Sequence, residues 1–419
     1  MTTARHIIKY KFLKHILKQY GVININMNKQ LNVILVGAGG YGETYVDLLI
    51  NGNIREYLRF AAVVDPYAQN SRLYGQFKDK VPVYERLEDF FSENSGNSAD
   101  LTIISSPIQF HYNQCVTALG HGSHVLCEKP LVPTLEQYDL LEKKIQISGK
   151  TLSVGFQWCY SEVMLELKKR ILSGEFGKPV CFKSFVSWPR DWHYYARSGG
   201  WAGKINSVGG EPICDSVASN ATAHYIQNML FLLGGTMEES ADLKNTSVEC
   251  YKANDIESFD TIAFRGEANG TEIFYVASHA VNYQINPVMY YDFEEASALV
   301  NVFNEDFQCN IHHRNGTVEN LGNAIANGER NKLLYTAQSI LGERDFVCTA
   351  RTVRPFTAFI DFVFNRIPFR VFADEFVVKD EKTEHTYVKN LHLDLARCFS
   401  LGKLPSELAL PWAKAPAFH

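Results

Sequence analysis

The stretch from Leu31 to Tyr45, LNVILVGAGGYGETY, constrains the fold more than any other part of the chain. An apolar run is followed at once by a G-x-G-x-x-G pattern, after which a helical pattern begins. A strand that turns on glycines into a helix gathers free N–H groups and the positive end of the helix dipole, and these bind a pyrophosphate. The pattern therefore predicts a dinucleotide-binding turn made of Gly37, Gly39, Gly40, Tyr41 and Gly42.

A second apolar run, Arg59 to Asp65, ends in an acid. Asp65 follows Gly42 by 23 positions, close to the spacing expected for a carboxylate that binds the adenosine ribose hydroxyls. Because its charge would repel a 2′-phosphate, the cofactor is expected to be NAD rather than NADP, although Arg72 nearby leaves a relaxed preference open. The alternative is a structural glycine turn followed by an unrelated loop aspartate.

Composition narrows the class of protein further. With 419 residues the chain is long enough for two domains, and a net charge of −5 does not favour nucleic acid as a partner. No apolar run is long enough to span a bilayer. Nine cysteines without a C-x-x-C pair suit free thiols in a reducing cytoplasm, and no metal-ligand spacing is present.

The first 30 residues differ from the rest because they contain basic but no acidic residues. Apolar residues at helical spacing there are compatible with a membrane-surface helix or a transit peptide. A secretory signal peptide needs an unbroken apolar core, which the lysines interrupt. We expect residues 1–30 to be a disordered extension or the product of an early start site, since Met27 lies just before the first strand.

Residues 31–156 alternate strand and helix patterns, which predicts a doubly wound parallel sheet of the Rossmann type. Ligands of such sheets bind beyond the carboxyl ends of the strands. The predicted strands are Asn32–Val36, Phe60–Asp65, Val81–Tyr84, Leu101–Ser105, His124–Cys127 and Leu152–Phe156.

Two motifs follow predicted strands in this first domain. One is Ser-Pro-x-x-x-His at Ser106 to His111, and the other is Glu-Lys-Pro at Glu128 to Pro130. Together with the glycine turn, they resemble the Gfo/Idh/MocA oxidoreductase family (glucose–fructose oxidoreductase, inositol 2-dehydrogenase, rhizopine catabolism). The resemblance implies that the following residues line the cofactor site: Ser105, Ser106, Pro107, His111, Glu128 and Lys129.

Lys129 is the first candidate for catalysis. A lysine at the carboxyl end of a strand can reach the nicotinamide crevice, and a desolvated site lowers its pKa. It can then hydrogen-bond a substrate hydroxyl or relay its proton during hydride transfer. The alternative is a solvated surface lysine. The family often has a cis bond before the proline, here Pro130, but the sequence does not show the isomer.

In residues 157–419 the alternation of strand and helix patterns gives way to successive strand patterns joined by turns. This predicts a second domain built on a large, open, mostly antiparallel sheet with helices. The turn signals include Ala268-Asn269-Gly270 and Asn315-Gly316. In the family, such a domain holds the substrate on one face of its sheet and usually contacts another subunit on the other face. The resemblance therefore implies a homodimer or homotetramer.

The family usually has D-x-x-x-H at the head of a helix that ends in Leu-Leu-Gly. Here His224 occupies the histidine position, but the residue four before it is Asn220 instead of aspartate. Asn220 can orient a hydroxyl but cannot stabilise an imidazolium, so Asp215 is a candidate to supply that charge. His224, with a pKa near neutrality, would be the general base. The alternative is a structural histidine at a helix start.

An aromatic and basic stretch between Trp188 and Lys204 is suited to sugar rings and hydroxyls, or to a subunit interface. Residues 157–160 follow the last parallel strand, where the family often contacts substrate, but they contain no basic residue, which argues against a strongly anionic substrate. The residues predicted to contact substrate, besides Asn220 and His224, are Gln157, Trp158, Trp192, Arg197 and Trp201.

These features predict an NAD-dependent oxidoreductase acting on a secondary alcohol of a sugar, cyclitol or glycoside. Two alternatives remain open. One is an enzyme of the same fold that oxidises a sugar transiently, cleaves or eliminates a group and reduces it again. The other is a regulator that binds dinucleotide without catalysis. The presence of Lys129 and His224 argues against this second alternative.

Overall fold

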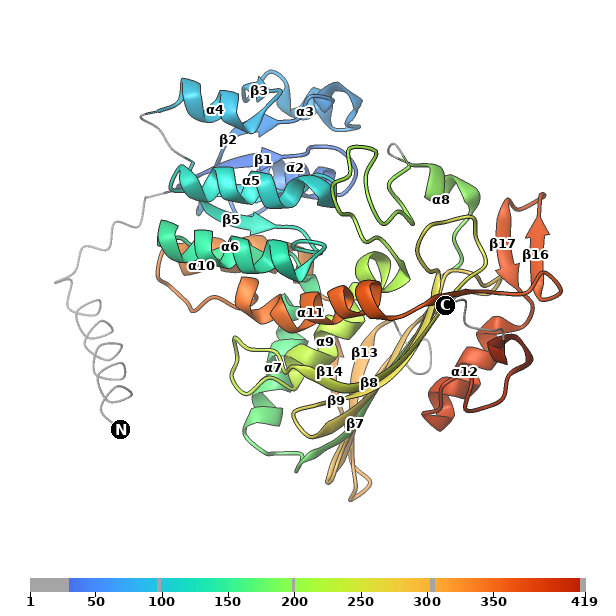
Figure 1. The fold of residues 1–419 in the computed structure, drawn as a ribbon. Helices are drawn as coiled ribbons and strands as arrows, with labels where there is room; N and C mark the ends of the chain where they lie inside the picture. Colours follow the sequence, from blue (N-terminus) through green and yellow to red (C-terminus); the bar gives the residue numbers. More distant parts are fainter. Residues whose placement is uncertain (1–29, 96–98, 198–199, 302–305, 415–419) are drawn as a thin grey trace.

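The computed structural model describes residues 30–95, 99–197, 200–301 and 306–414 (Figure 1). Almost all of the predicted extension, residues 1–29, lies outside this part of the chain. The described residues form a six-stranded sheet, a nine-stranded sheet and a separate hairpin of two strands. In the described residues, no helix is long and apolar enough to cross a membrane.

The first sheet is wholly parallel, with strand order β3-β2-β1-β4-β5-β6. All six predicted strands are confirmed, and the central ones are buried on both faces, as valine- and isoleucine-rich parallel strands must be. The strands are β1 (Leu31–Val36), β2 (Leu58–Val64), β3 (Val83–Tyr84), β4 (Leu101–Ile104), β5 (His124–Cys127) and β6 (Leu152–Val154).

Helices cover both faces of this sheet. On one face lie α4 (Leu87–Glu93), α5 (Ile108–Gly120) and α6 (Leu135–Ser148), of which α5 and α6 lie side by side in Figure 1. On the other face, α2 (Gly42–Asn51) and α3 (Tyr74–Phe77) are joined by a later helix, α10 (Gly328–Ile340). α10 inserts Leu333, Leu334 and Ala337 into the core of the first sheet. The predicted domain boundary at residue 156 stays a prediction.

The second sheet has the order β14-β13-β12-β11-β7-β10-β9-β8-β15. Only β7–β10 and β8–β15 pair in parallel, so the prediction of a large, mostly antiparallel sheet is confirmed. The strands are β7 (Pro179–Ser187), β8 (Leu243–Lys252), β9 (Thr261–Ala268), β10 (Thr271–Ser278), β11 (Ile285–Phe293), β12 (Ala296–Val300), β13 (Gln308–His313), β14 (Val318–Asn323) and β15 (Phe369–Val371). Asn269 and Gly270 both have positive φ, as the predicted tight hairpin requires.

The two faces of this sheet are covered differently. One face packs against α7 (Glu162–Leu172), α9 (Ala223–Leu232) and α11 (Ala350–Arg366), and this core is continuous with that of the first sheet. The outer face of β7, β8, β9 and β10 packs against α12 (Leu391–Leu401) and the residues after it. Figure 1 shows α12 and the hairpin of β16 (Val377–Asp380) and β17 (His385–Val388) on that side. The remaining short helical segments are η1 (Ala68–Asn70), η2 (Gln157–Tyr160), α8 (Trp192–Ala196), η4 (Val217–Ala221) and η5 (Pro411–Lys414).

Candidate active site

The glycine turn between β1 and α2 has the shape of a phosphate cradle. A Cβ atom at Gly42 would lie 2.1 Å from the carbonyl oxygen of Gly37, so only glycine allows the helix to begin this close to the strand. In contrast, a Cβ at Gly39 or Gly40 would meet no atom within 4 Å, so the outer side of the turn is open. The buried hydroxyl of Ser105, at the end of the neighbouring β4, has no hydrogen-bond partner. These features fit a bound pyrophosphate.

Asp65 lies beside this cradle, at the end of β2. Its carboxylate accepts hydrogen bonds of 2.8 Å from the backbone N–H groups of Ala38 and Tyr67. An ionised carboxylate has about four acceptor sites, so capacity remains for two ribose hydroxyls. Arg72 does not compete for this position, because its Nε donates to the carboxylate of Glu43 at 2.7 Å. Arg72, which from the sequence could have bound a 2′-phosphate, is thus already paired with Glu43.

His111 lies beneath the site rather than in it. Its ring is buried at 2% exposure, with Nε2 2.8 Å from the carbonyl oxygen of Ser106 and Nδ1 2.9 Å from that of Pro130. Burial lowers its pKa, and the surrounding carbonyl oxygens oppose that change. In this position His111 links the Ser-Pro motif to the Glu-Lys-Pro motif and presents no free nitrogen to a cofactor.

Glu128 is also occupied by protein groups. The hydroxyl of Tyr45 donates to its carboxylate at 2.6 Å, and the ammonium of Lys332 forms a short ion pair with the same oxygen. Lys332 is fully buried, and its Nζ also donates to the hydroxyl of Tyr41 at 2.8 Å. Tyr41 in turn donates to Gln157 at 3.0 Å. Glu128 therefore ties the glycine turn to α10.

Lys129 points toward the second sheet's helices. Its Nζ donates to the backbone carbonyl of Asn220 at 2.7 Å and to its side-chain oxygen at 2.9 Å. The Lys129–Pro130 peptide bond is cis, as the resemblance implied. Burial, opposed by the charges of Glu128 and Asp215 and assisted by those of Lys332 and Arg197, lowers the pKa of Lys129 to about 8. A substantial fraction of Lys129 is therefore neutral at physiological pH.

Asn220 connects this lysine to an acid. Its side chain hydrogen-bonds to the carboxylate of Asp215, which also accepts from the backbone N–H of Gly203 at 2.6 Å. Since the amide accepts from Lys129 and donates to Asp215, an aspartate at this position could not make both bonds. Burial raises the pKa of Asp215 to about 6. The predicted catalytic residues Lys129, Asn220 and Asp215 are thus in one hydrogen-bonded row.

His224 lies one turn further on, where the irregular turn η4 passes into α9. Its ring packs edge-on against Phe156 with 5.6 Å between centroids, and its Nδ1 has no hydrogen-bond partner. Burial, with the charges of Lys129 and Lys332, lowers its pKa well below the ordinary value. The expectation that His224 titrates near neutrality is wrong, because two ammonium groups face a desolvated imidazole.

Of the residues predicted to contact substrate, Gln157 and Arg197 lie near the candidate site. Trp158 and Trp192 have other roles in the fold. Gln157 joins the Tyr41 network, and Arg197 lies over the rings of Tyr194 and Trp201 at 3.8 and 5.2 Å. Trp158 is 3% exposed and packs edge-on against Tyr225, so it belongs to the core. Trp192 donates its indole N–H to Thr386 of β17 at 3.0 Å, which fixes α8 to the hairpin.

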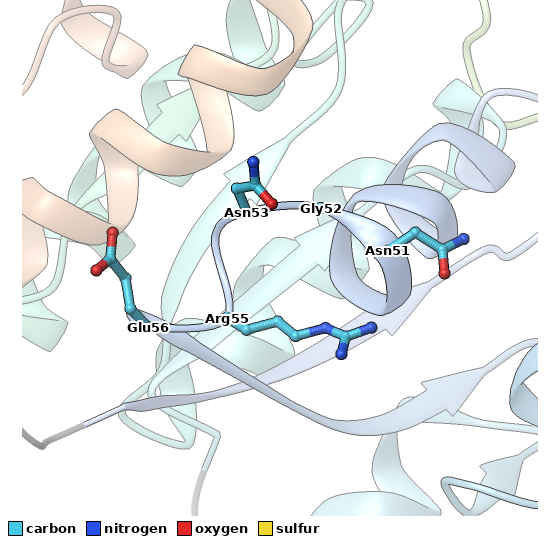
Figure 2. Close-up of a pocket in the computed structure, with 5 residues that line it drawn as sticks. All are labelled: Asn51, Gly52, Asn53, Arg55 and Glu56. Atoms are coloured by element: carbon cyan, nitrogen blue, oxygen red, sulfur yellow. The ribbon is translucent and has the colours of Figure 1, made fainter.

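A surface hollow elsewhere does not belong to this site. Figure 2 shows its lining, Asn51, Gly52, Asn53, Arg55 and Glu56, whose side chains do not converge on one point. These residues connect the end of α2 to the start of β2, at the edge of the parallel sheet opposite the glycine turn. Among the described residues, no three His, Cys, Asp or Glu side chains could hold a metal ion.

Comparisons with known proteins agree with this architecture. A profile of the family described as "Oxidoreductase family, NAD-binding Rossmann fold" (GFO_IDH_MocA) matches residues 31–156. Inositol 2-dehydrogenase from Corynebacterium glutamicum is 28% identical over 173 residues, which are 41% of this chain and 50% of that protein. The NAD-dependent scyllo-inositol 2-dehydrogenase of Bacillus subtilis is also 28% identical, over 38% of this chain and 45% of that protein. The chain thus spans about half the length of these curated relatives.

Among solved structures, the WlbA dehydrogenase from Bordetella pertussis, in complex with NADH and UDP-GlcNAcA, superposes with a TM-score of 0.63. The match covers 80% of this chain and 96% of that one, at 17% identity, so it extends the likeness in fold to the second sheet. The parallel sheet, the glycine turn and the family profile together define an NAD-binding Rossmann domain in residues 31–156. Residues 31–156 are thus similar to the NAD-binding domain of the Gfo/Idh/MocA family.

Proposed function

We propose that the protein transfers a hydride between NAD and a secondary alcohol of a sugar, cyclitol or glycoside. The observation that supports this most is the row Lys129–Asn220–Asp215, which extends from the Glu-Lys-Pro motif beside the dinucleotide cradle. NAD, when bound, supplies the hydride acceptor. The chain's residues then have to bind the alcohol, orient it and accept its proton.

Lys129 is the group best suited to accept that proton. Its pKa of about 8 leaves enough neutral amine at physiological pH and enough basicity to take a hydroxyl proton. Asn220 fixes the direction of the amine, and Asp215 stabilises the ammonium formed. The strongly lowered pKa of His224 makes its imidazole a weak base, so it orients a substrate hydroxyl by hydrogen bonding instead of accepting the proton.

The cofactor preference belongs to the same proposal. Asp65 favours NAD, and Arg72 is held by Glu43 and does not extend toward a 2′-phosphate. The relatives' names, inositol dehydrogenases and a sugar-nucleotide-bound dehydrogenase, support a polyhydroxylated substrate. A homodimer or homotetramer and a cytoplasmic location remain expectations from sequence.

The test is absorbance of reduced nicotinamide when the purified protein is mixed with NAD and a panel of sugars, inositols and glycosides. Accumulating NADH with one substrate would support net oxidation, and Lys129→Ala should abolish most turnover while NAD still binds. If Lys129→Ala turns over at the wild-type rate, the assigned role of Lys129 is wrong. Bound nicotinamide that changes state without accumulating would favour transient oxidation. NAD binding without any turnover would favour a regulator.

A further inference from the structure

Two arginines beside the candidate site have no acidic partner among the residues that the structure describes. Arg190 follows β7 and Arg197 follows α8, and their guanidinium carbons lie 4.9 and 3.8 Å from the centroid of the same ring, Tyr194. Within the described part of the chain, neither guanidinium forms an ion pair, and the Nε of Arg190 is buried without a hydrogen-bond partner. In contrast, Lys204, on the same loop, pairs with Glu257 at 2.9 Å.

Arg197 lies close to the reacting groups, and Arg190 shares the ring of Tyr194 with it. Gly203 and Lys204 lie against Asp215, since Gly203 N–H donates to its carboxylate and Asp215 N–H donates to the Lys204 carbonyl at 2.9 Å. The charge of Arg197 is close enough to lower the pKa values of both Lys129 and Asp215. A ligand group that binds Arg197 would therefore lie next to the row Lys129–Asn220–Asp215.

His279, directly after β10, adds a ring nitrogen that can accept a hydrogen bond from a ligand hydroxyl. It is 2% exposed, and its Nδ1 lies 2.8 Å from the carbonyl oxygen of Trp188, so Nδ1 must donate. Burial and the two arginine charges lower its pKa to about 3, so the ring is neutral and Nε2 is left as an acceptor without a partner. The hydroxyl of Tyr195 is also buried and unpartnered in the described structure.

Two guanidinium groups with adjacent hydroxyl-binding atoms match a carboxylate on a polyhydroxylated molecule. A guanidinium is planar and binds a carboxylate through two parallel hydrogen bonds. We propose, on the basis of the proposed function, that the substrate is a sugar acid whose carboxylate binds Arg197 and Arg190. A phosphate is the less suitable anion, because the only lysine of the 188–204 loop is engaged by Glu257.

The experiment compares acids with their neutral counterparts on the full-length protein saturated with NAD. Calorimetric titration with glucuronate against glucose, and galacturonate against galactose, gives the preference for a carboxylate. We expect the acid to bind at least about tenfold tighter, as charge-assisted hydrogen bonds imply. Arg197→Gln should remove most of that preference, Arg190→Gln should reduce it, and Lys204→Gln should leave it unchanged.

The outcomes separate this inference from the proposed function. Equal affinity for acid and neutral sugar, or no measurable affinity for either acid, would overturn it. So would tighter binding of glucose 6-phosphate than of both acids, which would assign the arginines to a phosphate. Acid binding that depends on Arg197, without formation of NADH, would support the inference and contradict the proposed hydride transfer.

Discussion

At the scale of single residues, the titration of Lys129 has a consequence that can be measured. Its folded-state pKa is lowered to about 8, so the neutral form that accepts a proton increases as pH rises through 8. We expect kcat for alcohol oxidation to rise roughly tenfold between pH 7 and pH 9 and then to level off. Stopped-flow or steady-state NADH formation across this range would measure it.

Lys129→Arg is the matched variant for this profile, because arginine stays charged throughout. It should be slow and lack the rise near pH 8. A flat wild-type profile between pH 7 and pH 9, in a step limited by chemistry, would contradict the assignment of Lys129 as the base.

Asp65 should decide which dinucleotide binds. Asp65→Ala removes a charged acceptor for the ribose hydroxyls, so NAD affinity should fall by about tenfold or more, and NADP affinity much less. Quenching or enhancement of NADH and NADPH fluorescence would give both affinities. Arg72→Ala is the control, because its guanidinium is paired with Glu43 and should not affect NAD. Equal losses for both dinucleotides would mean that Asp65 does not hold the ribose.

At the scale of elements, two glycines of the β1–α2 turn have different roles. Gly42 is needed for folding, and Gly39 is needed for binding the cofactor. Gly42→Ala would push a methyl group against the Gly37 carbonyl, and we expect a loss of about 1–3 kcal/mol of stability or more. Gly39→Ala meets no atom within 4 Å, so its stability should be unchanged. NAD affinity should nevertheless fall for Gly39→Ala, because the methyl group occupies the space of the pyrophosphate. Thermal unfolding and NAD titration of both variants test this.

The elements also show how far the sequence could predict the fold. All six parallel strands were predictable, because buried parallel strands read as short apolar runs between helices. β11 is harder to predict from sequence, since its neighbouring Tyr290 and Tyr291 face opposite sides of the strand and hide its alternation. The same holds at the site: Lys129 follows from its motif, but its contact with Asn220, 91 positions away, depends on tertiary packing.

Lys332 had no local signal at all. A lysine in a helix is ordinarily read as a solvated residue, and its partner Glu128 lies 204 positions earlier in the chain. Trp158, predicted to contact substrate, belongs to the core because large aromatic side chains serve both purposes equally well. Sequence patterns thus predict residues that sit in motifs, and not those that are brought to the site by distant elements.

At the scale of the whole molecule, the Glu128–Lys332 pair fixes α10, which follows the second sheet's β14 in the chain, to the first sheet. Lys332→Met would leave Glu128 buried without a counter-charge, and we expect the free energy of unfolding to fall by ~3–5 kcal/mol. The double variant Lys332→Met, Glu128→Gln should recover part of this loss. Urea unfolding would measure both.

The control for that pair is Lys204→Met. Lys204 and Glu257 form an ion pair whose side chains are about half exposed, so its removal should cost at most ~1 kcal/mol. If Lys332→Met is no more costly than Lys204→Met, the buried pair does not hold α10 on the first sheet.

The cover over the outer face of the second sheet has a consequence for biosynthesis. β7, β8, β9 and β10 present a continuous apolar face that is buried by α12 and by Leu404, Leu410 and Trp412. Since a ribosome makes these covering residues more than a hundred positions after β10, these strands lack their cover for several seconds of synthesis. During that interval the same face is available to chaperones, or to the face of another nascent chain, and only completion of the covering segment removes it from competition.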